Sequence, residues 1–163
     1  MAFLSVVTTV RATSQEDFRY SVYKSNGTAY IEKYIGSSAV VDVPSSIRAD
    51  SGDRDDDGNP IYRNYTVTCI SKYAFSGNVG ITQVSIPETI TDGSKLCIFA
   101  ECTNLREVNF KGVVRDIPTG MFSKCSNLQT LDLQWDSIES IGSGAFQDCG
   151  YDFGELDYLP NVK

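Results

Sequence analysis

Three of the five cysteines in this chain recur at a regular spacing. Cys102, Cys125 and Cys149 are 23 and 24 residues apart. A cysteine in such a pattern could ligate a metal, form half of a disulfide or act as a nucleophile. A structural zinc site, however, needs four converging ligands, and a single-file row of three does not converge. Parallel side chains in register also suit a disulfide poorly, so we predict that the row packs as small buried hydrophobes.

The other two cysteines, Cys69 and Cys97, lie outside this row. A bridge between them stays open as an alternative to two free thiols. Histidine is absent from the chain, which removes the commonest general base and the usual partner of a serine or cysteine nucleophile. The sequence also holds no phosphate-binding loop and no nucleophile elbow. We therefore expect a protein that is not an enzyme.

The acidic stretch DRDDDGNPIYRN is the second candidate for chemistry. Asp53, Asp55 and Asp57, followed by Gly58, match the first half of a calcium loop, in which alternate carboxylates converge on one cation. The twelfth position holds Asn64, where such a loop places a bidentate glutamate. The alternative is a solvated turn in a long hairpin that joins VPSSI to YTVTCI. We favour the turn, and calcium is the cofactor that the sequence leaves open.

Composition narrows the classes of function. The chain has 163 residues, 41% of them hydrophobic, which suffices for one domain or one elongated array with a buried core. Its 21 acidic residues exceed its 14 lysines and arginines, and no basic patch interrupts them, so we do not expect a nucleic-acid partner. No apolar run approaches the roughly 20 residues that span a bilayer, so we expect no membrane span.

The N-terminal segment, residues 1–17, is interpreted as a signal remnant or a disordered tail. Its first ten residues, MAFLSVVTTV, are apolar but lack a positive n-region, and Val10 and Ala12 fit the small-residue positions of a cleavage site. An ordinary first strand is the alternative. Two sequons, which begin at Asn26 and Asn64, would carry glycans only in a eukaryotic secretory pathway.

An internal repeat occupies most of the remaining chain. Two units align when FAECTNLREVNFKGVVRDIPTGMF is laid over FSKCSNLQTLDLQWDSIESIGSGAF. The shared apolar positions, beyond the phenylalanine and cysteine, are Leu105 and Leu128, Val108 and Leu131, Phe110 and Leu133, and Ile117 and Ile141. An earlier unit begins at Phe75 and places Asn78 in the cysteine position, and the partial unit VVDVPSSI precedes it. The pattern L-x-x-L-x-L at this period indicates a leucine-rich repeat.

The repeat also predicts how the units pack. The last two apolar residues of each unit are two apart, so both point inward from one short strand. No unit can bury its apolar side alone, but stacked units form a continuous core with neighbouring strands about 4.8 Å apart. The Asn-Gly pair at 26–27 predicts a β-hairpin of strands 18–23 and 29–35. We expect this hairpin to cover the edge of the first repeat.

These motifs resemble the BspA-type, or Treponema pallidum-type, leucine-rich repeats, whose unit reads roughly IP-x-x-V-x-x-I-G-x-x-A-F-x-x-C-x-x-L-x-x-V. The matching segments are SIPETI, IGSGAFQDC, FSKCSNLQTL and FAECTNLREV. The resemblance covers about residues 18–150 and departs from the pattern at TITDGSKLCIF, which lacks Ile-Gly, and at GYDFGELDYLPNVK. It implies a right-handed, β-rich leucine-rich-repeat solenoid of the β-α superhelix type with an N-terminal β-hairpin cap.

On this basis we expect the hairpin cap at residues 18–39 and the solenoid at 40–163, with a polar insertion at 48–64. The tail beyond Cys149 has no obvious cap, so either it folds over the last repeat or the natural chain continues.

The candidate binding surface is the concave strand face. In L-x-x-L-x-L the residue between the last two apolar positions points to solvent. The residues of this column are Asp42, Ser85, Asn109 and Asp132. The flanking column contains Gln83, Glu107 and Thr130, and the residues that follow the strands are Lys111, Gln134 and Trp135. Together these ten residues are the candidate set. Solenoids commonly bind partners on this surface. An exposed Trp135 would suit protein or glycan contact, and the alternative is a plain solvated face with Trp135 packed on its neighbour.

The resemblance implies a secreted or cell-surface bacterial protein that mediates adhesion or protein–protein contact. The implied partners are host cells, extracellular matrix or other cells, and no cofactor is required. Two alternatives stay open: a structural spacer or accessory module of a larger surface protein, and a glycan-binding module.

Overall fold

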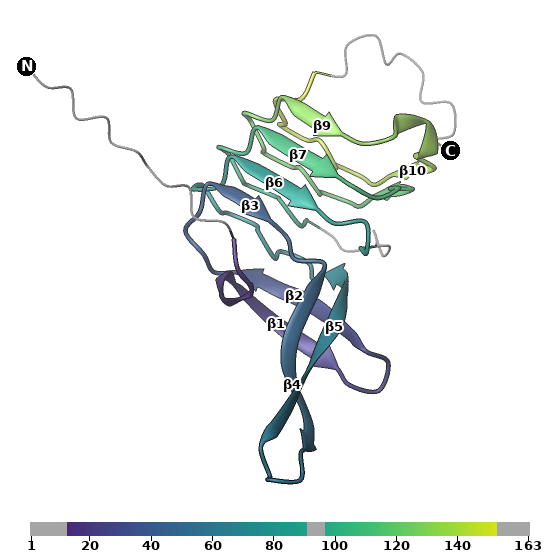
Figure 1. Cartoon of the computed structure of the whole chain (residues 1–163). Coiled ribbons are helices and arrows are strands. Elements are labelled where there is room, and N and C mark those ends of the chain that lie inside the picture. The colour runs from purple at the N-terminus through teal and green to yellow at the C-terminus, as the bar shows by residue number, and fades with distance from the viewer. Residues whose placement is uncertain (1–12, 91–96, 153–163) are drawn as a thin grey trace, which may run out of the picture.

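Parallel strands, one from each repeat, form the central sheet of the computed structural model, which describes residues 13–90 and 97–152. Its order is β3 (Val40–Asp42), β6 (Gln83–Ile86), β7 (Glu107–Phe110) and β9 (Thr130–Asp132). Figure 1 shows these four strands stacked one above another. All three pairings run without a register shift, so equivalent residues of successive repeats are direct neighbours.

A second four-stranded sheet lies at the N-terminal end of this stack (Figure 1). The hairpin predicted around Asn26-Gly27 is confirmed, because β1 (Phe18–Tyr23) and β2 (Thr28–Tyr34) pair antiparallel. This sheet is wider than the predicted two-stranded cap. β2 also pairs parallel with β5 (Pro60–Ile70), and β5 pairs antiparallel with β4 (Ser46–Arg54). The polar insertion forms the outer part of the β4–β5 hairpin, which projects away from the repeats.

Short elements and turns make up the rest of each repeat. β8 (Asp116–Ile117) and β10 (Ser140–Ile141) pair parallel in a two-stranded sheet. The described part of the chain contains the 3-10 helices η1 (Gln15–Asp17) and η2 (Trp135–Ser137) and no α-helix. Turns therefore occupy the positions where the β-α type of repeat places a helix, and that expectation is not met in the described residues.

The backbone conformation of these turns explains why no helix forms there. Tyr73, Cys97, Gly120 and Gly144 occupy equivalent positions, and their φ angles are 61°, 55°, 64° and 63°. A second left-handed position follows four residues later in each repeat, at Gly77, Glu101, Lys124 and Asp148. A right-handed helix cannot continue through residues in this conformation. Two such residues per repeat turn the chain back toward the next strand.

The interior of the stack contains a ladder of aromatic rings. Phe75, Phe99, Phe122 and Phe146 succeed one another with ring centroids 5.2, 5.7 and 5.4 Å apart. Tyr34 of the N-terminal sheet stacks on Phe75 at 5.6 Å and so extends the ladder across the boundary between the two sheets. Because the first three phenylalanines are almost fully buried, this ladder holds successive repeats in one continuous core.

Candidate functional site

The outward side of the parallel sheet brings seven of the predicted binding residues into two aligned columns. We call these seven the strand face: Asp42, Ser85, Asn109 and Asp132 in one column, and Gln83, Glu107 and Thr130 in the other. The pleat points them outward, and all seven are exposed or half-buried. The alternate residues Val84, Val108 and Leu131 are buried. The predicted alignment is therefore found, while a role in binding stays a prediction.

The strand face is regular because equivalent residues on neighbouring strands lie one strand spacing apart, about 4.8 Å. Along one column the side-chain amide Nε2 of Gln83 donates a hydrogen bond to Oε1 of Glu107, 3.1 Å away. That bond restrains the carboxylate of Glu107 at the centre of the face. A bound partner would thus meet polar groups whose positions the backbone register determines.

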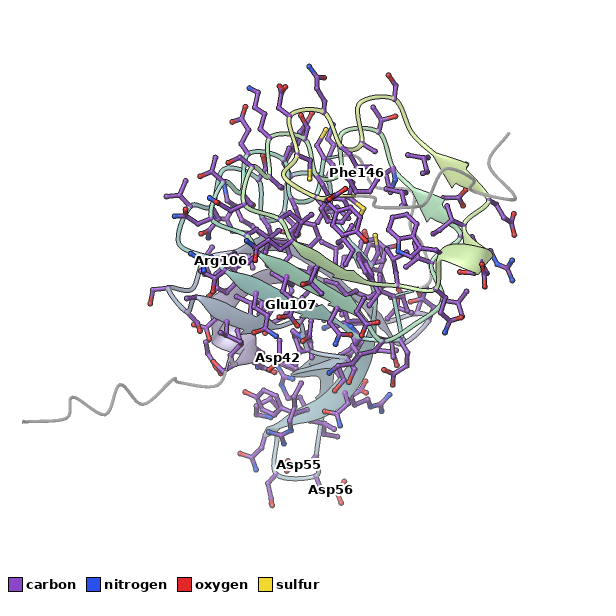
Figure 2. The ribbon with its side chains drawn as sticks, turned by 90° about the horizontal axis from the view of Figure 1, so that it is seen from above. Asp42, Asp55, Asp56, Arg106, Glu107 and Phe146 are labelled. Carbon is purple, nitrogen blue, oxygen red and sulfur yellow. The ribbon has the colours of Figure 1, made fainter. Side chains whose placement is uncertain are left out.

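Negative charge predominates on the strand face. Asp42, Glu107 and Asp132 supply three carboxylates, and Figure 2 shows Asp42 and Glu107 along the strands. Arg106 and Lys111, at the two ends of β7, are exposed beside them. A face with this balance favours a partner segment that carries positive charge.

The side chains of Thr13 and Gln15 bond backbone groups on two edge strands, β3 and β4. The hydroxyl Oγ1 of Thr13 accepts a hydrogen bond from the backbone N–H of Asp42 in β3, at 2.9 Å. The side-chain amide of Gln15 bonds both backbone groups of Arg48 in β4, at 3.0 and 3.2 Å. Side chains thus satisfy backbone groups that would otherwise be open to pairing with another chain.

Of the two candidate residues that follow β9, Trp135 departs from the exposed arrangement considered for it. Trp135 is half-buried in η2, and its ring stacks on that of Tyr151 with centroids 5.9 Å apart. Its centroid also lies 6.5 Å from that of Phe146, at the C-terminal end of the aromatic ladder. The packed alternative is therefore found. Gln134, directly before η2, is exposed. The indole ring is engaged in the core and does not form part of the strand face.

The predicted packing role is found for two of the three cysteines in the row, while Cys149 is only half-buried. The thiols of Cys102 and Cys125 are fully buried and donate hydrogen bonds to the carbonyl oxygens of Phe75 and Phe99, at 3.0 and 3.1 Å. Burial raises the pKa of Cys102 from 9.0 to about 11. Burial and the neighbouring thiols raise the pKa of Cys125 as well. These thiols stay protonated and donate to backbone, which suits neither metal binding nor nucleophilic attack.

The remaining cysteines form no disulfide either, so the bridge considered between Cys69 and Cys97 is absent. Cys69 is buried, and Cys97 is half-buried in one of the left-handed turns. The thiol of Cys97 lies close over Gly120, where an added Cβ would approach it to 2.8 Å. Gly120 therefore allows the close approach of these two turns.

The acidic stretch forms the tip of the β4–β5 hairpin, where Figure 2 labels Asp55 and Asp56 far from the strand face. Asp55 Oδ1 accepts the backbone N–H groups of Asp57 and Asn59, at 3.0 and 2.8 Å. Asp53 instead pairs with Arg63, at 2.8 Å. Within residues 13–90 and 97–152, no group of three histidine, cysteine or acidic side chains is placed to hold a metal ion. Asp55 serves the turn, and calcium binding stays an untested prediction.

The sequence did not predict a cavity of about 370 Å³ beside the ends of β6 and β7. Ile86, Phe110 and Met121 contribute to its wall, and Glu88, Arg115 and Asp116 also line it. The segment TITDGSKLCIF, which lacks the Ile-Gly pair of the other repeats, falls in the same part of the sequence, and its residues 91–96 lie outside the described residues.

A family model for the BspA type leucine-rich repeat region matches residues 59–158 in six copies. The chain belongs to the BspA-type leucine-rich repeat family. Proteins of this repeat family generally act through protein–protein interaction and are generally not enzymes.

Solved structures agree with the family assignment. The chain is similar to a leucine-rich repeat protein from Bacteroides ovatus ATCC 8483, with 25% identity and a TM-score of 0.62 over 83% of this chain. It spans only 32% of that protein. It is also similar to a leucine-rich repeat protein from T. pallidum, with 25% identity and a TM-score of 0.54 over 85% of this chain and 68% of that one. These similarities establish the strand-rich leucine-rich-repeat fold.

No curated protein matches the chain. Within the described ranges, no helix has the length and apolar character needed to cross a membrane.

Proposed function

We propose that this BspA-type protein is a non-catalytic binding module that docks a protein partner on the strand face. The observation that carries the proposal is the unshifted register of four parallel strands, which presents two columns of polar side chains on a rigid support. Repeat proteins use such extended surfaces for binding. Three carboxylates on the face favour a partner segment rich in lysine or arginine.

The proposal extends to location and to the kind of contact. We place the protein outside the cell or on its surface, where it adheres to host tissue or to other cells. Support comes from the family, whose members are typically surface-associated. Protease treatment of intact cells tests the location. Cleavage of the protein while a cytoplasmic marker stays intact supports a surface position, and full protection contradicts it.

The binding test reverses charge on the strand face. Cross-linking first identifies a partner, and the affinity of the purified pair is then measured. Glu107→Lys with Asp132→Lys should weaken binding by about tenfold or more and leave the melting temperature nearly unchanged, because both side chains point to solvent. Glu139→Lys with Asp148→Lys is the matched control, since both are exposed and lie off the strand face. Equal weakening by both pairs, or by neither, contradicts docking on the strand face.

The same experiment separates the alternatives. A spacer or accessory module needs no contact at the strand face, so its partner would bind both charge-reversed variants equally well. A glycan-binding module would rely on an accessible aromatic platform. Trp135 offers little of its ring for that purpose because it packs on Tyr151. We therefore keep a protein as the proposed partner.

A further inference from the structure

The cavity of about 370 Å³ is lined mostly by apolar side chains from successive repeats. Its apolar wall includes Ile86, Ile90, Phe110, Val113, Val114 and Met121. The volume lies within the range of sites that bind small molecules, about 300–1,000 Å³, and such sites are mostly apolar with a few polar groups. The wall of this cavity has that composition.

A comparison of successive repeats shows that the cavity is local to one part of the stack. Ile138 of the last described repeat is almost fully buried, at 1% exposure. Val114 and Ile90, at the corresponding places one and two repeats earlier, are only half-buried and line the cavity. Apolar side chains that the stack otherwise covers are therefore accessible here. Occupation by an apolar group would remove their surface from water, which is favourable.

The rim of the cavity carries an excess of negative charge. Arg115 lines the cavity, and its guanidinium pairs with the carboxylate of Glu139 at 2.5 Å, so that one acidic group balances this one cation. Asp116 lines the cavity as well and accepts a hydrogen bond from the hydroxyl of Ser140, also at 2.5 Å. Glu88 adds a second exposed carboxylate. A cationic group at the rim would meet these two carboxylates, whereas an anionic group would be repelled.

We propose that this cavity binds a small amphiphile with a short hydrocarbon body and a cationic amine head. The hydrocarbon lies against Ile90, Phe110 and Val114, and the amine lies at the rim beside Glu88. The site is separate from the strand face, because its residues come from the ends of β6 and β7 and from the segment that leads into β8. It therefore does not depend on the proposed docking of a protein partner.

The methionines provide a direct test, because the chain has two and Met121 lines the cavity. The full chain is labelled with methyl-¹³C-methionine and titrated with octylamine, octanol and octanoate. Saturable movement of the Met121 signal, with the Met1 signal unchanged, is the expected result. Octylamine should bind about 3- to 10-fold more tightly than octanoate, since exposed charges contribute modestly. Glu88→Gln should reduce that ratio and leave octanol binding unchanged.

Filling variants complete the test. Val114→Phe places extra volume in the cavity and should abolish the Met121 response. Val79→Phe is the matched control because Val79 is exposed and lies outside the cavity. If Val114→Phe does not fold, Ile90→Phe serves the same purpose. The absence of a saturable Met121 shift with all three probes overturns the proposal, as does a shift that persists unchanged in the filling variants. Binding of octanoate as tight as that of octylamine overturns its cationic part.

Discussion

The thiol of Cys125 donates a hydrogen bond across 3.1 Å to the backbone carbonyl oxygen of Phe99, in the preceding repeat. Cys102 makes the same contact with Phe75. The buried cysteines of the row therefore link adjacent repeats. Each thiol acts as a hydrogen-bond donor to the backbone of the preceding repeat.

This contact predicts how stability depends on alkaline pH. Because the pKa of Cys102 rises from 9.0 to about 11 on folding, the thiol is more readily ionised in the unfolded chain. Its contribution to stability is complete below pH 9 and is lost as pH rises toward 11 and beyond. Urea unfolding at pH 8, 9.5 and 10.5 measures this loss. Cys102→Ala should show a shallower decline than the wild type, and parallel declines would contradict the prediction.

Thiol reactivity gives an independent measurement on the same row. In the native protein Cys102 and Cys125 should resist alkylation, because they are buried and protonated. Cys97 and Cys149 are half-buried and should react first. Mass spectrometry of peptides after brief iodoacetamide treatment identifies the modified sites, and urea-unfolded protein is the control in which all five react. Equal rates at Cys125 and Cys97 in the native protein would count against the buried row.

The aromatic ladder predicts a large loss of stability when a central ring is removed. Phe122 is fully buried between Phe99 and Phe146. Phe122→Ala should lower the free energy of unfolding by about 3–5 kcal/mol, whereas Phe122→Leu, which leaves a smaller void, should cost less. Fluorescence of Trp135, the single tryptophan, reports the unfolding. Equal costs for the two variants would show that the ladder is not tightly packed.

The left-handed conformation of Tyr73 predicts that glycine is more stable than alanine at this position. Tyr73 has a φ of 61°, and its side chain is 51% exposed, so little packing is lost when it is removed. Tyr73→Gly relieves strain of about 1–2 kcal/mol but makes the unfolded chain more flexible. We expect a net gain of roughly 0.5–1 kcal/mol over Tyr73→Ala, which keeps the Cβ, in urea unfolding. A Tyr73→Gly variant no more stable than Tyr73→Ala contradicts this prediction.

The tip of the β4–β5 hairpin allows two interpretations of Asp55 to be compared, a residue that stabilises the turn and a calcium ligand. The backbone N–H of Asn59 is the first cause of the lowered pKa of Asp55, followed by the Asn59 side chain. That carboxylate therefore stabilises the folded tip above its ordinary pKa, and its contribution is lost as pH falls. Asp55→Ala should speed hydrogen exchange at the amides of Asp57 and Asn59. If the loop binds calcium instead, adding a chelator to the wild type would speed the same exchange.

The sequence alone determined the features that follow from the side-chain period of a strand, from the length of the repeat and from local turn residues. A strand has a side-chain period of two, so Asp132 between Leu131 and Leu133 had to point outward once a strand was assigned there. The repeat of 23–24 residues then predicted that Asp132 aligns with Asn109, and the parallel register confirms it. The Asn26-Gly27 hairpin likewise depends only on local turn chemistry.

Contacts between distant segments decided the rest. Nothing near Trp135 in the sequence shows that its ring stacks on Tyr151, because that packing depends on where the chain goes after β10. The parallel pairing of β2 with β5 joins residues that are more than thirty positions apart. The cavity is lined by side chains that are far apart in the sequence, from Ile70 to Met121, and periodicity alone does not predict such a void. Periodicity determines which way a side chain points, and only the packed tertiary structure determines what it meets.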